Sequence, residues 1–117
     1  LFMIYTSYFE AVRDFKDTNR LVSIAFWTAP EFKHIQKYMK LAPTQDILAR
    51  FKEDKNEGAY TKAFYKQVLA RLDPGYIFRK FDGKILLCYE KPGKFCHRHI
   101  VSRWLRNHGY PCQEMDW

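Results

Sequence analysis

The chain has 117 residues, which is the length of one domain. Its content of 47% hydrophobic and 18% aromatic residues excludes a disordered chain. The sequence lacks the apolar run of about 18 residues that a membrane-spanning helix needs, and no secretory signal opens it. We therefore expect a single domain over residues 1–117. One interpretation of Leu1 and Phe2 is that they are not native and that Met3 is the natural start.

The formal net charge of +7 lies almost entirely in the second half of the chain. Residues 1–58 carry a net +1, whereas residues 59–117 carry a net +6. A basic half favours an anionic partner, such as nucleic acid, a nucleotide, another phosphorylated ligand or a membrane surface. The alternative is a basic surface that only keeps the protein soluble, and charge alone does not separate the two.

Three cysteines, Cys88, Cys96 and Cys112, cannot all pair within one chain. At this chain length an odd count argues against a disulfide scaffold and favours a reducing, cytoplasmic setting. Such a setting allows thiol chemistry without establishing it.

The first half of the chain alternates short β-prone runs with helical spacing. Residues 3–6 predict a strand that ends before Ser7, and residues 9–16 carry apolar side chains at helical spacing. The nearly all-apolar run 21–26 predicts a strand that is covered on both faces. Residues 32–39 then predict an amphipathic helix.

The second half gives clearer helix signals. Thr44 is a suitable N-cap, and the helix that follows it is expected to end at residues 56–58. Apolar side chains at every fourth position predict a helix over residues 60–72. Asp73 followed by Pro74 is typical of the start of a further short helix.

Three elements complete the pattern: a strand over residues 84–89, a helix over 96–108 and a last short strand over 110–115. Apolar strands that alternate with helices predict a parallel sheet with helices on both faces. The expected fold is therefore a single small three-layer α/β domain with a mainly parallel sheet of three or four strands.

The ends of the predicted strands indicate where a ligand would bind. In open α/β sheets, ligands bind outside the carboxyl ends of the strands. At the ends of the first two strands, the candidate ligand-binding residues are Thr6, Ser7, Tyr8 and Trp27.

The third predicted strand leads into the segment with the most polar chemistry. Its catalytic candidates are Cys88, Glu90, Cys96 and His97, and its ligand-binding candidates are Lys91, Lys94 and Arg98. A helix start presents free N–H groups and a partial positive charge, which bind anions and favour a thiolate. We therefore expect Cys96 to act as a nucleophile, while His97 and Glu90 move protons.

Other interpretations of these residues are structural. Cys88 ends a buried strand, where cysteine is more often an inert core residue, and His97 could simply bond to the backbone. Lys94 stands where the phosphatase loop, with a Cys and an Arg flanking five residues, needs arginine. No Gly-rich phosphate loop is present, and the Cys and His spacings match no standard zinc ligand set, although Cys88, Cys96, His97 and His99 could converge in the fold. No metal or cofactor is therefore expected.

The same segment resembles a known family. The strand end Leu-Leu-Cys-Tyr-Glu at 86–90, and the Cys-His-Arg at 96–98 that opens a helix containing Arg-Trp-Leu at 103–105, are similar to the signature of the domain-of-unknown-function 488 family. Residues 4–7 and 41–44 match more weakly. The resemblance implies a compact Rossmann-like α/β domain with the Cys-His-Arg motif at its cleft, but no established activity.

Carried over residue by residue, the resemblance implies that the site consists of Cys88, Glu90, Cys96, His97 and Arg98. The chain departs from the family pattern after the first strand. Ser7 and Tyr8 stand where the family often has a small, glycine-like residue.

Three functions are open on these observations. The first is a thiol-dependent enzyme that acts on a nucleotide or nucleic acid, and the second is a non-catalytic binder of nucleic acid or a phosphorylated small molecule. The third is a protein-interaction or regulatory module. We favour a cytoplasmic anion-binding domain that binds or acts on nucleic acid or nucleotides through the helix start at 96–98, without a membrane partner.

Overall fold

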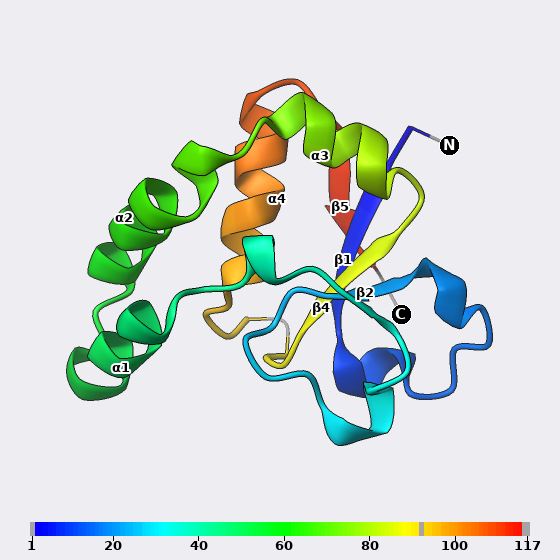
Figure 1. The fold of residues 1–117 in the computed structure, drawn as a ribbon, viewed down its shortest axis with the longest axis horizontal. Coiled ribbons are helices and arrows are strands. Elements are labelled where there is room, and N and C mark those ends of the chain that lie inside the picture. Colours follow the sequence, from blue (N-terminus) through cyan, green and yellow to red (C-terminus); the bar gives the residue numbers. More distant parts are fainter. Residues whose placement is uncertain (1, 92, 116–117) are drawn as a thin grey trace.

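A sheet of five parallel strands forms the centre of the molecule, as described by a computed structural model for residues 2–91 and 93–115 (Figure 1). The strands are β1 (Ile4–Tyr8), β2 (Leu21–Ser23), β3 (Gln36–Lys37), β4 (Ile85–Cys88) and β5 (Cys112–Glu114). Their order across the sheet is β3-β2-β4-β1-β5. The parallel α/β fold expected from the sequence is confirmed, with five strands rather than three or four.

Four α-helices within the described residues pack against one face of the sheet: α1 (Gln45–Asp54), α2 (Glu57–Gln67), α3 (Pro74–Phe81) and α4 (His97–Asn107). Alternate residues of a strand point to opposite faces. Leu86 in the central strand β4 therefore packs in the same core as Phe64 of α2 and Val101 of α4. None of the helices in the described part of the chain is long and apolar enough to cross a membrane.

Within the described residues, the opposite face of the sheet is covered by short 3-10 segments instead of α-helices. Ile85 and Leu87 of β4 form a second core with Phe9, from the segment Phe9–Val12, and Phe32, from the segment Pro30–Phe32. The two outer layers of the domain therefore differ in kind, because all four α-helices lie on the other face.

The helix starts follow the expected capping chemistry. The Thr44 side chain accepts a hydrogen bond from the Ile47 N–H, and Asp73 caps α3 with Pro74 at its first turn. Asn56, which was expected to end the first helix, instead caps the start of α2 by accepting from the Ala59 N–H. An N-cap oxygen satisfies one N–H group that the helix itself leaves without a partner.

Two predicted elements of the first half are wrong. Residues 32–39 form no α-helix, because Gln36 and Lys37 pair with the edge of β2 as the strand β3, and Met39 is 51% exposed. The helix expected over residues 9–16 is a single 3-10 turn over Phe9–Val12. Apolar spacing alone does not separate a helix from short turns that bury the same side chains.

The strand boundaries of the first half also shift. Ser7 and Tyr8 do not end β1 but continue it, because they pair with Leu87 and Cys88 of β4. The second strand is shorter than residues 21–26 and ends at Ser23. The carboxyl ends of β1 and β4 therefore lie side by side.

The cap of α1 gives a direct stability test. Replacing Thr44 by Ala removes the acceptor for the Ile47 N–H and the bond that the Thr44 hydroxyl donates to Gln67. We expect Thr44→Ala to lower the free energy of unfolding by about 1 kcal/mol in urea titrations. Thr44→Ser keeps the hydroxyl and is the matched control. A serine variant that loses as much stability as the alanine variant would contradict the capping role.

Candidate functional site

The fully buried side chain of Arg98, in the first turn of α4, joins the carboxyl ends of three strands. Its Nε and Nη2 atoms donate to the carboxylate of Glu114 in β5, at 3.1 and 2.8 Å. Its Nη1 atom donates to the carbonyl oxygen of Glu90 and to the Cys88 sulfur, the latter at 3.3 Å. The guanidinium also lies 5.6 Å from the ring centre of Tyr8, at the end of β1. One side chain thus connects β1, β4, β5 and α4.

Glu114 neutralises the charge of Arg98 and is itself held by a second donor. The Thr6 hydroxyl donates to the same carboxylate. Partial burial acts to raise the pKa of Glu114, but the bonds from Arg98 and Thr6 outweigh it and the pKa lies below its usual value. Because the guanidinium donates to protein acceptors, Arg98 positions the start of α4.

His97 ties the same helix start to β2. Its Nε2 lies 2.6 Å from the carbonyl oxygen of Ile24, and since a carbonyl can only accept, Nε2 carries the proton. Burial lowers the pKa of His97 to about 4, with the charges of Arg98 and His99 contributing. The imidazole is therefore neutral at pH 7, and its unprotonated Nδ1 lies 3.9 Å from the Cys96 sulfur.

Cys88 and Cys96 form a disulfide between the end of β4 and the start of α4. The sequence favoured free thiols and a Cys96 thiolate, whereas in this form of the protein neither sulfur is a thiol. The difference arises because Arg98 holds the two elements together, so residues that are eight positions apart meet. The third cysteine, Cys112, is buried and outside the disulfide.

An aromatic-walled hollow of about 220 Å³ opens over the disulfide. We call it the aromatic cleft; its lining includes Trp27, Phe51, Tyr60, Phe95, Cys88, Cys96 and His97. Three of the rings pack on one another, because Phe95 lies 5.2 Å from Phe51 and 4.9 Å from Tyr60 between ring centres. Trp27, from the loop after β2, is 72% exposed. The cleft thus offers flat apolar surfaces beside two sulfur atoms.

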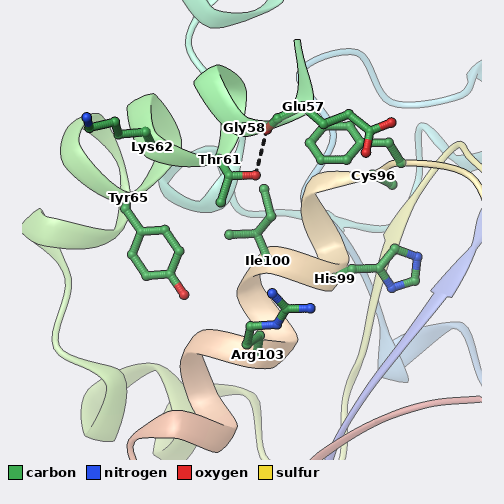
Figure 2. Close-up of a pocket in the computed structure, with 10 residues that line it drawn as sticks. Glu57, Gly58, Thr61, Lys62, Tyr65, Cys96, His99, Ile100 and Arg103 are labelled. Atoms are coloured by element: carbon green, nitrogen blue, oxygen red, sulfur yellow. Dashed lines mark hydrogen bonds between the residues drawn. The ribbon is translucent and has the colours of Figure 1, made fainter. Parts of the chain in front are cut away.

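A second hollow, of about 530 Å³, lies between α2 and α4 (Figure 2). We call it the basic groove; its polar lining residues are Glu57, Thr61, Lys62, Tyr65, His99 and Arg103. Figure 2 shows Tyr65 of α2 and Arg103 of α4 directed into the same space. The basic groove shares Phe95 and Cys96 with the aromatic cleft. The two hollows therefore meet at the start of α4.

The structure brings part of the predicted site together. Five of the candidates line the aromatic cleft: Trp27, Cys88, Glu90, Cys96 and His97. Thr6 and Ser7 are fully buried in β1. Lys91 is exposed and lies 3.8 Å from the carboxylate of Glu10, while the backbone N–H of Lys94 bonds to the carbonyl oxygen of Lys91. The two lysines thus belong to the exposed turn beside the cleft.

Sequence reasoning missed Glu114 and the aromatic wall made by Phe51, Tyr60 and Phe95. Glu114 falls in the expected last strand, and its place at a carboxyl end was a usable signal for a partner of Arg98. The aromatic residues gave no such signal, because at helical spacing they are equally typical of an ordinary core.

Comparison with known proteins returns a protein family. The family model described as DUF488-N3a, the active DUF488-N3 subclade, matches residues 16–109. No curated protein and no solved structure matches the chain.

Burial of neutral His97 predicts acid sensitivity. A histidine titrates near 6.5 when unfolded, while the folded protein holds the pKa of His97 at about 4. Protonation therefore favours the unfolded chain, and the stability present above pH 6.5 is lost as the pH falls toward 4. The expected slope is about 1.4 kcal/mol per pH unit.

The measurement is urea unfolding at pH 7.5, 6 and 5, above the range in which carboxylates titrate. His97→Gln keeps a donor for the Ile24 carbonyl but cannot titrate, so its stability should change less between pH 7.5 and 5 than that of the wild-type protein. Equal slopes for the two proteins would show that His97 does not carry the acid sensitivity.

Proposed function

The chain belongs to the DUF488 family, in its active DUF488-N3 subclade, and on that premise we propose that it binds nucleotides, free or within a nucleic acid. The base would lie in the aromatic cleft, and the phosphates would extend into the basic groove. The observation that carries the proposal is that these two hollows, one aromatic and one basic, share Phe95 and Cys96.

Each half of the arrangement suits one part of a nucleotide. Bases of any kind stack on aromatic side chains, and Trp27 offers an indole that is 72% exposed. Phosphates are held by lysine and arginine through charge, in a manner that weakens as salt rises. Lys62 and Arg103 are both exposed and come from facing helices. A ligand that spans the start of α4 would meet both kinds of group.

The start of α4 supports anion binding through its backbone. Cys96 occupies the N-cap position and its side chain makes no capping hydrogen bond. A helix start presents N–H groups and a partial positive charge. In this proposal Arg98 positions that helix start, while exposed Lys94 adds positive charge beside it.

The proposal extends to catalysis, in which a thiol would act on the bound nucleotide. Cys96 lines both hollows, so a reduced Cys96 would lie next to the bound ligand. The cytoplasmic setting favoured by the odd cysteine count belongs to the same proposal, because a thiol requires a reducing compartment.

The test is fluorescence anisotropy with labelled 12-nucleotide single-stranded DNA and RNA, the matching DNA duplex, and a labelled adenine nucleotide. We expect the single strands to bind more tightly than the duplex, since stacking requires an unpaired base. We also expect affinity to fall steeply between 50 and 200 mM salt. No binding of any of these probes at 50 mM salt would remove the proposal.

Two variants separate the aromatic cleft from the basic groove. Trp27→Ala should weaken single-strand binding about tenfold with little change in its salt dependence. Lys62→Ala with Arg103→Ala should reduce the slope of log affinity against log salt by about 1.4. The matched control is Lys16→Ala with Lys33→Ala, which removes two exposed charges from the opposite face of the sheet. A control that loses as much affinity as the groove variant would contradict the assigned surface.

A further inference from the structure

Three side chains of metal-binding type converge at the floor of the aromatic cleft. The sulfurs of Cys88 and Cys96 and a ring nitrogen of His97 all lie within 4.8 Å of one another. All three residues are buried, with exposed fractions of 1%, 8% and 6%. We propose that, once the disulfide is reduced, Cys88, Cys96 and His97 bind one zinc ion whose fourth coordination position opens into the aromatic cleft.

The ligand set is one that zinc accepts. Thiolate and imidazole ligands favour zinc over hard cations. Two cysteines and one histidine leave one of the four tetrahedral positions for water or a ligand, which is the pattern of catalytic rather than structural zinc sites. All three residues line the aromatic cleft, whose volume is about 220 Å³. The structure thus provides space for a fourth ligand on the side of the cleft.

The surroundings of the three residues are those of a metal site. A histidine that binds zinc usually donates its other ring N–H to a carbonyl or carboxylate, which fixes the ring. His97 does this already, because its Nε2 donates to the Ile24 carbonyl at 2.6 Å and leaves Nδ1 toward the Cys96 sulfur. Arg98 donates to the Cys88 sulfur at 3.3 Å, which stabilises a thiolate there.

The backbone spacing suits two thiolates around an ion. The Cα atoms of Cys88 and Cys96 are 7.3 Å apart, whereas a disulfide usually joins Cα atoms 4.4–6.8 Å apart. In a tetrahedral zinc site with Zn–S bonds of about 2.3 Å, the two sulfurs are about 3.8 Å apart. Reduction would let the sulfurs move to that separation without bringing the backbones of β4 and α4 closer.

A phosphine reductant converts the disulfide into two thiols in a reaction whose atoms and electrons balance. The phosphine attacks one sulfur and breaks the S–S bond, and water then supplies oxygen to phosphorus and protons to the sulfurs. The products are one phosphine oxide and two thiols. Zinc then replaces the two thiol protons, which are released to solvent. No group beyond the phosphine, water and the ion is required.

The inference goes beyond the proposed nucleotide binding and does not rest on it. Zinc binding is measured without any nucleotide, so the two proposals can fail separately. The sequence alone predicts no metal, because the spacing of the three residues matches no standard motif, although it leaves open that Cys88, Cys96, His97 and His99 converge. The site arises from the fold, which places the end of β4 against the start of α4.

The experiment begins with the protein of 117 residues reduced by a phosphine, which is then removed under anaerobic conditions. Zinc is titrated in competition with a chromophoric chelator, and cobalt(II) is bound in parallel as a spectroscopic probe. We expect one ion per chain, with a thiolate-to-cobalt charge-transfer band and the visible bands of a tetrahedral site. The untreated disulfide form should bind at least about 100-fold more weakly.

Cys96→Ser and His97→Gln should each lower zinc affinity at least tenfold. Cys112→Ser is the matched control, since Cys112 is buried but outside the cluster and should leave affinity unchanged. Wild-type affinity in the Cys96→Ser variant, or a disulfide that resists the phosphine in the native protein, would overturn the proposal.

A second measurement needs no variant and so does not depend on its folding. Reduced wild-type protein is treated with iodoacetamide with and without zinc, and the alkylated cysteines are located by mass spectrometry. Zinc should slow the alkylation of Cys88 and Cys96 at least tenfold and leave that of Cys112 unchanged. Equal alkylation of Cys88 and Cys96 under both conditions would contradict the site.

Discussion

The ion pair between Arg98 and Glu114 is the constraint on which the carboxyl edge of the sheet depends. Transfer of a charged group from water to a protein interior costs several kcal/mol, which is offset only when its partners are all in place. Arg98 is fully buried, and its donors reach Glu114, the Glu90 carbonyl and the Cys88 sulfur. These partners come from β5, from the loop after β4 and from β4 itself. A buried arginine thus fixes the relative positions of the elements that line the site.

The chemistry of the site follows from that arrangement. Because α4 must start beside the end of β4, Cys96 meets Cys88, and His97 reaches the carbonyl that follows β2. The aromatic cleft then lies on one side of this junction and the basic groove on the other. The surplus positive charge of residues 59–117 is divided between the interior and the surface. Arg98 is neutralised inside the domain, while Lys62 and Arg103 stay at the surface of the groove.

The sequence predicted those elements of the fold that depend on neighbouring residues along the chain. Thr44 and Asp73 mark helix starts by their capping side chains, and the all-apolar run of β4 is typical of a central parallel strand. The predicted helix over residues 32–39 is wrong because Phe32 and Ile35 are buried by turns, and the pairing of Gln36 with β2 depends on a strand elsewhere in the chain. The rule that ligands bind at the carboxyl ends of parallel strands placed Trp27, Cys88 and Cys96 in one candidate site, and all three line the aromatic cleft. It also places Glu114, at the end of the last strand, near Arg98, but it does not show that Arg98 is fully buried and that its charge is neutralised within the domain.

The most direct test of this account is a double-mutant cycle on Arg98 and Glu114, measured as the free energy of unfolding in urea at pH 7.5. The variants are Arg98→Met, Glu114→Leu and the two combined. Glu114→Leu leaves the fully buried Arg98 charge without its partner and should cost about 3–5 kcal/mol, whereas Arg98→Met should cost less because the Glu114 side chain is 28% exposed. The double variant should be at least 2 kcal/mol more stable than the sum of the single losses predicts. Additive losses, or single variants as stable as the wild-type protein, would contradict the claim that this pair organises the site.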